Sequence, residues 1–144
     1  MLKKILLTAG ILLLIGAGII WYLYTDTFKD TAKIDAAYSV DAVTFIKEFE
    51  KNLPEANKKY TEKIIAITGK ISEKQSNDSS INLIITDTTK GSYINFSFQQ
   101  QGMAAAKLIK EGDNVYIKGS CSGGAYSEIL ETHYINFKRC TINK

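Results

Sequence analysis

The side chains that could carry catalysis are few, and the sequence does not group them. His133 is the only histidine, and Cys121 and Cys140 are separated by 18 residues with no second pair of cysteines. A metal site needs three or four convergent His, Cys, Asp or Glu ligands, so we expect no metal site and no cofactor. The 15 carboxylates are scattered among lysines, and no two of them stand at a spacing that indicates acid–base work.

The Gly-rich run GSCSGG at residues 119–124 is the next candidate for chemistry. It follows a strand-like segment, but it opens no clear helix and has no Lys after it, so a phosphate-binding loop is not expected. A nucleophile elbow of the Gly-x-Ser-x-Gly kind is missing from the sequence. We therefore expect a protein that is not an enzyme and has no catalytic residues.

The two cysteines have a simpler use. If the domain lies outside the cytoplasm, they are more often bonded than free, and a disulfide between Cys121 and Cys140 would close a loop of about 20 residues and contribute about 3 kcal/mol. In a simple hairpin their Cα atoms would lie beyond the limit of roughly 7 Å for a disulfide. A long loop at 122–133 or strand curvature must then bring them together.

The N-terminal residues predict a membrane anchor. Lys3 and Lys4 precede 20 uncharged residues, 5–24, and a helix of this length spans the roughly 30 Å apolar core of a bilayer. Trp21 and Tyr24 stand near the end of this run, where aromatic rings prefer the interface. The preceding lysines favour a single-pass protein of the cell membrane with a cytoplasmic N-terminus and an extracytoplasmic C-terminal domain, periplasmic or extracellular.

A cleaved signal peptide is the alternative, because residues 16–18 (GAG) offer small side chains at a cleavage position. The signal anchor is favoured, because cleavage there would leave the apolar residues 19–24 as a sticky N-terminus. No Cys stands near the end of the run, so a lipid acceptor is missing.

The chain beyond this anchor (1–25) is long enough for one domain. Residues 26–38 have no strong period and are expected to form a linker to an OB-fold domain with an N-terminal helical extension at 39–144. After residue 25, 16 Lys and Arg nearly balance 15 Asp and Glu. A surface that tracks phosphates would need a cationic stripe, so nucleic acid is not the favoured partner.

Residues 39–60 have the three- and four-residue spacing of helices. Ser39 can cap a first helix, with Asp41 in its first turn. A second helical segment begins at Pro54, which is favoured in a first turn, and directs Ala56 and Tyr60 inward. The apolar face of the first helix comprises Ala42, Phe45, Ile46, Phe49 and Leu53.

From residue 63 the period changes to two. This predicts strands at 63–73, 81–88, 93–98 and 114–121, and a last strand or pair of strands within 128–142 that carries Ile129, Ile135 and Phe137. The composition of 74–80 and 89–92 predicts turns, and that of 122–127 predicts a loop.

A helix is expected between the third and fourth strands. There Ala105, Leu108 and Ile109 share a face, and Gly112 stands where a C-cap belongs. Leu108 and Ile109 should close one end of the core. The strand side chains expected to point inward are Ile65, Ile67, Leu83, Ile85, Ile94, Phe96, Phe98, Val115, Ile117 and Phe137.

Three strands, a helix and two further strands form the chain order of the oligonucleotide/oligosaccharide-binding (OB) barrel, in which the helix plugs one end. The expected fold class is therefore mainly β, a β-barrel with helices. In full, it is a five-stranded OB-fold barrel preceded by an N-terminal transmembrane helix and a short helical segment. The alternative is an open α+β sheet with the first helix packed on one face.

A binding surface of such a barrel would lie across its second and third strands. Tyrosines and amides with few charges suit stacking on a sugar or holding an extended peptide at least as well as stacking on bases. Ordinary polar residues facing water are the alternative interpretation. The outward side chains are expected to be Asn82, Thr86, Tyr93, Asn95 and Ser97, with Tyr116 and Lys118 on the fourth strand.

Three segments also indicate a family. EANKKYTEKIIAITGKIS (55–72), EGDNVYIKGSCSG (111–123) and FKRCTI (137–142) together resemble the tRNA-anti-like OB-fold family of bacterial membrane proteins and lipoproteins. The resemblance covers about residues 36–142 and implies an OB fold, a short helical segment before it and a location in the cell envelope. It implies no activity, because fold likeness alone does not carry function.

The favoured function is a non-catalytic, membrane-anchored OB-fold binding or interaction module of the bacterial cell envelope. Apart from the membrane, the partners expected for it are an envelope protein, a peptide or an oligosaccharide. A nucleic-acid-binding OB domain is the first alternative, and an envelope hydrolase is the second.

Overall fold

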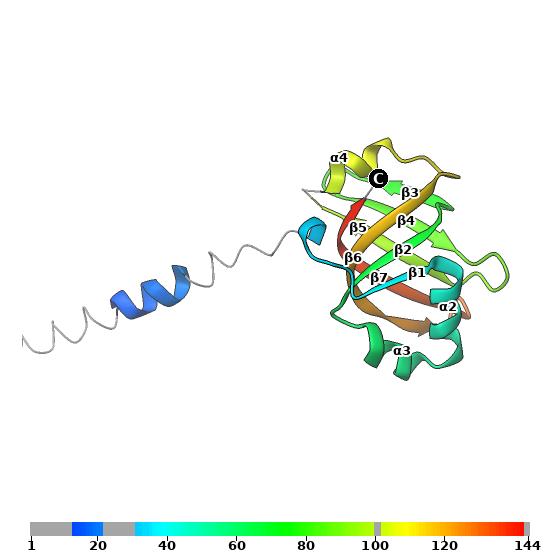
Figure 1. The fold of residues 1–144 in the computed structure, drawn as a ribbon, viewed down its shortest axis with the longest axis horizontal. Coiled ribbons are helices and arrows are strands. Elements are labelled where there is room, and N and C mark those ends of the chain that lie inside the picture. Colours follow the sequence, from blue (N-terminus) through cyan, green and yellow to red (C-terminus); the bar gives the residue numbers. More distant parts are fainter. Residues whose placement is uncertain (1–12, 22–30, 100–101, 143–144) are drawn as a thin grey trace, which may run out of the picture.

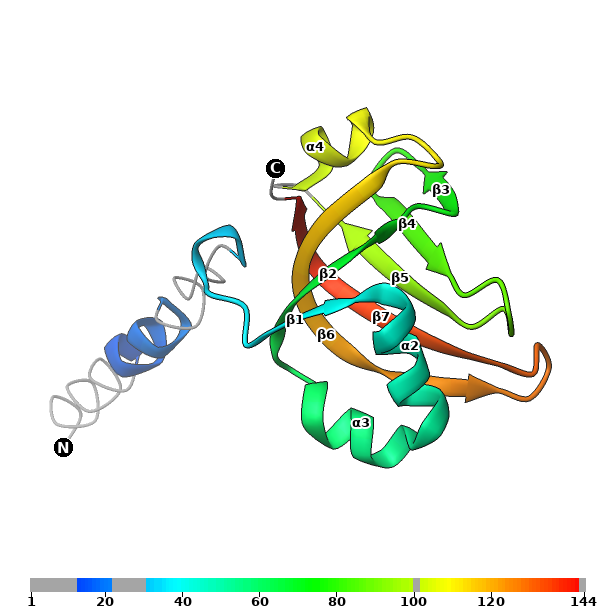
Figure 2. The same cartoon turned by 45° about the vertical axis from the view of Figure 1, so that its right-hand side comes forward.

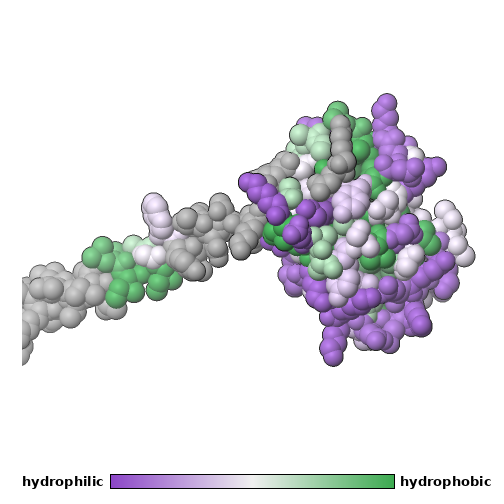
Figure 3. All heavy atoms as spheres, in the orientation of Figure 1, coloured by the Kyte–Doolittle hydropathy of each residue, from purple (hydrophilic) through white to green (hydrophobic). Residues whose placement is uncertain are grey.

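The structure, a computed structural model, describes residues 13–21, 31–99 and 102–142. Residues 13–21 are helical with exposed apolar side chains, and Figure 3 shows them as a hydrophobic stretch. The rest of the expected membrane span, 5–12 and 22–24, lies outside the described residues. Within the described ranges, no helix has both the length and the apolar character that a bilayer crossing requires.

The expected linker 26–38 is described only from residue 31. Thr31–Lys33 forms a 3-10 turn, η1, in which Thr31 is buried. The backbone N–H of Ala37 donates to the carbonyl oxygen of Ile64 at 2.8 Å. This part of the chain is therefore packed on the domain.

One curled sheet with helices at its two ends makes up the domain (Figure 1). Its strands are β1 (Tyr38–Asp41), β2 (Ile64–Lys70), β3 (Glu73–Ser76), β4 (Ile81–Thr86), β5 (Tyr93–Phe98), β6 (Asn114–Ser127) and β7 (Thr132–Ile142). Its helices are α2 (Ala42–Lys51), α3 (Leu53–Tyr60) and α4 (Met103–Leu108). Figure 2 shows α2 and α3 near one end of the curled sheet and α4 near the other.

The strand order is β1-β2-β6-β7-β5-β4-β3. β1 with β2 and β5 with β7 pair parallel, and the other neighbours pair antiparallel. The expected mainly β class is confirmed. The seven-stranded sheet is not closed by strand pairing, whereas a closed five-stranded barrel was expected.

The two sides of the sheet are nevertheless joined through the chain, because β2, which lies next to the edge strand β1, leads directly into β3 at the other edge. Only Ile71 and Ser72 separate β2 from β3. The N–H of Ile71 donates to the oxygen of Asp113 just before β6 (2.9 Å), and the N–H of Ser72 donates to the oxygen of Ile84 in β4 (2.8 Å). The expected first strand, 63–73, therefore ends at Lys70 in β2, which pairs with β6, and only its last residue, Glu73, lies in β3, which pairs with β4. This bend gives the OB-like curl.

Alternation predicted the inward side chains correctly. All ten expected strand residues are at most 5% exposed. The rings of Phe96 and Phe137 lie 5.1 Å apart across β5 and β7. Four of the five residues of the expected helical face are buried as well: Ala42, Phe45, Ile46 and Phe49.

The closing role expected for Leu108 is wrong, because Leu108 is 75% exposed. Helix α4 directs Ala106 into the core instead. A residue two positions later lies about 200° around a helix and so faces away from the core. Ile109 packs against the core in part.

The helix cap also differs from the expectation. Ser39 lies within β1, whose parallel pairing with β2 keeps it extended. Asp41 caps α2 instead, because its Oδ1 accepts from the N–H groups of Val43 (3.0 Å) and Thr44 (3.3 Å).

Two segments expected to be irregular belong to strands. Residues 74–76 lie in β3, and Asn77 makes the turn by accepting from the N–H groups of Ser79 and Ser80. Residues 122–127 extend β6, so the hairpin turn falls at 128–131. Ile129 therefore lies in this turn and is 94% exposed, rather than in a strand.

Candidate functional site

The outer face of β4, β5 and β7 gathers polar side chains that alternate with the core. Five of the residues expected in a binding surface lie on β4 and β5. The parallel pairing of β5 with β7 adds two that were not expected, Tyr134 and Asn136. All seven are half-buried. We call this surface the amide–tyrosine face; it comprises Asn82, Thr86, Tyr93, Asn95, Ser97, Tyr134 and Asn136.

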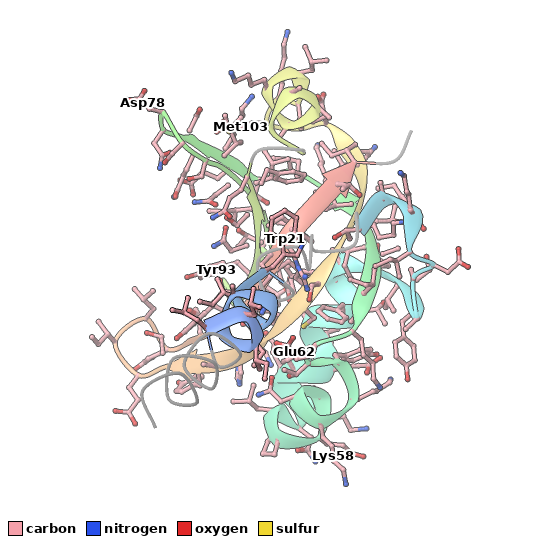
Figure 4. All side chains as sticks on the ribbon, turned by 90° about the vertical axis from the view of Figure 1, so that its left-hand side faces the viewer. Trp21, Lys58, Glu62, Asp78, Tyr93 and Met103 are labelled. Atoms are coloured by element: carbon pink, nitrogen blue, oxygen red, sulfur yellow. The ribbon has the colours of Figure 1, made fainter. Side chains whose placement is uncertain are left out.

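Two aromatic rings and two amides form the centre of the face. The rings of Tyr93 and Tyr134 stack with centroids 6.2 Å apart and planes inclined by 22°. Beside them, Nδ2 of Asn95 donates to Oδ1 of Asn136 at 3.3 Å. The Oδ1 atom of Asn95 is buried and has no hydrogen-bond partner within the described ranges. Figure 4 labels Tyr93, seen from the left-hand side of Figure 1.

The turn between β4 and β5 holds the tyrosine pair in place. Asp87 accepts from the N–H of Thr89 (3.0 Å), and this backbone hydrogen bond holds the pKa of the Asp87 carboxyl below its usual range. The hydroxyl of Ser92 accepts from the N–H of His133 at 3.2 Å. Since Ser92 precedes Tyr93 and His133 precedes Tyr134, this bond fixes the two strands next to the rings.

The chemistry of the face is that of a neutral surface. None of its seven residues is Asp, Glu, Lys, Arg or His. Ile84 lies among them with 9% exposure and pairs with Asn95 on one side and with Glu73 on the other. The face therefore offers rings, amides and hydroxyls, with the apolar side chain of Ile84 among them.

Tyr116 and Lys118 do not join the amide–tyrosine face. Ala125 is the β6 residue opposite Tyr134, and Tyr116 stands nine residues away from it along β6. Lys118 points outward as expected, but it is only 6% exposed because the segment around η1 covers it. Local alternation predicted the direction of Lys118 and gave no sign of what covers it.

The prediction of a disulfide is wrong, because Cys121 and Cys140 are both free and buried. The register of β6 and β7 places Phe137 opposite Cys121, so Cys140 lies three residues further along β7. Its Sγ occupies the space above Gly119, where a Cβ would lie only 2.8 Å away. The curvature of the hairpin thus does not bring the two thiols together.

His133 packs against a ring rather than among possible metal ligands. Its ring lies 4.9 Å from that of Tyr126. Among the residues that the structure describes, no group of three or more His, Cys, Asp and Glu side chains is arranged to hold a metal ion.

Comparison with known proteins supplies the family. The sequence model of the tRNA_anti-like family matches residues 1–132. The chain belongs to the tRNA_anti-like family. This agrees with the resemblance of the sequence segments. Among proteins with curated descriptions, none matches this tRNA_anti-like chain.

One solved structure supports the fold. A "putative nucleic acid-binding lipoprotein" from Klebsiella pneumoniae subsp. pneumoniae MGH 78578 has a TM-score of 0.57 and 16% identity, over 74% of this chain and 92% of that one. At this identity the likeness shows the fold alone. A replication Factor A related protein from Methanobacterium thermoautotrophicum matches 58% of this chain and 81% of its own at 18% identity. Its TM-score of 0.42 is too low to carry an argument.

Proposed function

We propose that this tRNA_anti-like protein is a non-catalytic binding module, anchored in the membrane of the cell envelope, and that its amide–tyrosine face binds a neutral oligosaccharide. The observation that carries the proposal is the stacked pair Tyr93 and Tyr134 beside the amides of Asn95 and Asn136. Tyrosine rings offer flat apolar area with a polar tip, and amides hydrogen-bond hydroxyl groups. OB folds hold oligosaccharides on this part of the barrel.

A sugar fits this face better than a peptide that adds a strand. Peptides that bind by strand addition need a free sheet edge. β4, β5 and β7 each have a paired strand on both sides. A ligand must therefore lie on the face itself and be held by side chains.

The location in the envelope is supported by three observations. Residues 5–24 are an uncharged run preceded by two lysines. The described part of that run, 13–21, is helical and exposes Leu13, Leu14 and Trp21 by about three quarters. The structural neighbour from Klebsiella is described as a lipoprotein.

A topology reporter tests this location. We expect an enzyme fused after Lys144 to be active only outside the cytoplasm, and we expect Lys3→Glu with Lys4→Glu to weaken that orientation. The matched control is Lys33→Glu with Lys63→Glu, because these lysines lie beyond the apolar run. A cytoplasmic C-terminus would refute the proposed location.

Binding of N-acetylglucosamine oligomers to the full-length protein in detergent tests the ligand class. Tyr93→Ala should weaken binding about fivefold or more, as expected for a stacking residue at the centre of an interface. The control is Tyr116→Ala, which removes an exposed tyrosine from another part of the sheet. No binding by the wild type, or equal losses in the two variants, would argue against this face as a glycan site.

Nucleic acid is the second candidate, because the Klebsiella neighbour is described as nucleic acid-binding and stacked tyrosines also suit bases. A shift assay with single-stranded RNA and DNA at two salt concentrations separates the two, since phosphate contacts weaken steeply with salt. Salt-sensitive binding that Tyr93→Ala abolishes would favour nucleic acid over a neutral glycan.

A further inference from the structure

A buried lysine on the outer face of β6 holds the segment that leads into the domain. Nζ of Lys118 donates to the carbonyl oxygens of Ala32 and Ile34, both at 2.8 Å. Thr31 is 4% exposed, and the N–H of Ala37 bonds to Ile64 of β2. Residues 31–37 therefore lie across β6 and β2, and we call them the strap.

Within 31–99 and 102–142, the oxygens that meet the charge of Lys118 are neutral carbonyl groups. The ion pairs formed among the described residues join Lys59 to Glu48, Lys90 to Glu50 and Lys138 to Glu62. Lys118 takes part in none of them. Removing an ammonium group from water costs several kcal/mol, and carbonyl acceptors recover only part of that.

Two hydroxyl groups next to Lys118 have no hydrogen-bond partner among the residues that the structure describes. Thr141 is paired directly with Lys118 across β6 and β7, and Ser120 follows two residues along the same side of β6. The Oγ atom of Ser120 and the Oγ1 atom of Thr141 are both buried, and neither forms a hydrogen bond to the described part of the chain. Burial of an unsatisfied polar group is unfavourable. Because η1 contacts both β6 and β7, the closed strap lies on the two strands that carry these hydroxyl groups.

We propose that the strap is displaceable and covers a second binding site, formed by Lys118, Ser120 and Thr141, for a ligand that carries an oxyanion such as phosphate. When closed, the oxygens of Ala32 and Ile34 take the place of the ligand's oxygens. When open, one cation and two hydroxyl donors stand together on adjacent strands, a set that suits an oxyanion. This site is separate from the amide–tyrosine face and does not rest on its proposed ligand.

Amide hydrogen exchange of the full-length protein tests the strap, with inorganic phosphate as the probe. Strap amides should exchange by local opening, faster than those of β4 and β5. Phosphate should accelerate strap exchange over chloride at equal ionic strength, because it binds the open form. In Lys118→Met, strap exchange should rise by roughly tenfold or more, since hydrogen bonds from a charged group are lost, and the phosphate effect should vanish.

Lys74→Met is the matched control. Nζ of Lys74 also donates to two carbonyl oxygens, those of Lys107 and Ile109 at 2.8 Å, but at the end of α4. It should loosen α4 and leave the phosphate effect on the strap intact. If Lys118→Met does not fold, Ser120→Ala with Thr141→Val keeps the lysine and should reduce the phosphate effect.

Three results would overturn the proposal. Strap amides could exchange only at the rate of the core strands. Phosphate could leave wild-type strap exchange unchanged. The phosphate effect could persist in Lys118→Met.

Discussion

Asn57 and Gly124 are joined by two hydrogen bonds although 67 residues separate them in the chain. Nδ2 of Asn57 donates to the oxygen of Gly124 at 2.9 Å, and the N–H of Gly124 donates to Oδ1 of Asn57 at 2.7 Å. A Cβ at Gly123 would lie 2.8 Å from the same Oδ1, and Gly123 has a φ of +95°. Because both positions are glycines, the side chain of Asn57 on α3 can approach β6 closely. It forms the two backbone hydrogen bonds with Gly124 that a neighbouring strand would otherwise form.

Replacing Asn57 by Ala should destabilise the domain by about 1–3 kcal/mol, because two part-buried backbone groups of Gly124 lose their partners. Urea denaturation of the full-length protein in detergent measures this change. The control is Asn57→Asp, which keeps an acceptor for the Gly124 N–H and should cost less. A loss below about 0.5 kcal/mol for Asn57→Ala would show that the pair is not a structural tie.

Phe96→Ala should cost about 3–5 kcal/mol, since it empties a fully buried site against Phe137. The adjacent Asn95→Ala removes one neutral hydrogen bond to Asn136 and should cost about 1 kcal/mol or less. Chemical denaturation of both variants compares the two faces of β5. Equal costs would contradict the register, because a one-residue slip exchanges the faces.

Alternation predicted correctly which side chains of β5 point inward, because the burial pattern of a strand is contained in its own residues. A strand buried on one face repeats every two residues, and Ile94, Phe96 and Phe98 show that repeat directly. Short edge strands are different. Tyr38–Asp41 is only four residues long, and its pattern does not show whether these residues form a strand beside β2 or the start of a helix. For this reason the sequence pattern predicts a helix cap at Ser39, which lies in β1.

The candidate face needed information that no local pattern holds. Tyr134 and Asn136 alternate with Ile135 and Phe137, so the sequence could show that they face outward. Their position beside Tyr93 and Asn95 depends on the parallel pairing of β5 with β7 across about 40 residues. The strap over Lys118 was missed for the same reason, because its partners lie 84 and 86 residues away.

Glu48 should make stability depend on pH. Burial acts to raise the pKa of its carboxyl, but hydrogen bonds from Lys59 (2.9 Å) and Tyr60 (2.8 Å) outweigh it and hold the pKa below its usual range. A lowered pKa in the folded state stabilises the protein above the unfolded value of about 4.3. This contribution is lost as the pH falls through the folded value.

Glu48→Gln should therefore be less stable than the wild type at neutral pH, by about 1 kcal/mol for a partly exposed pair. The difference should close on acidification. Denaturation curves at several pH values measure this difference in stability. The control is Lys59→Met, made in the wild type and in Glu48→Gln, because it removes one of the two hydrogen-bond donors to the Glu48 carboxylate. A gap that does not change with pH would contradict the assignment to the Glu48 carboxylate.

Both thiols should be unreactive in the native protein. Burial raises the pKa of Cys121 to about 11, against a hydrogen bond from the backbone of Gly123, and burial likewise raises the pKa of Cys140. The thiolate is the reactive form, and both side chains are at most 2% exposed. A maleimide or disulfide reagent should thus label neither cysteine until denaturant is added, after which both should react. Fast labelling of the native protein would contradict the burial of the two thiols. A mass lower by two hydrogens without reductant would indicate a disulfide and would contradict the register that places Phe137 opposite Cys121.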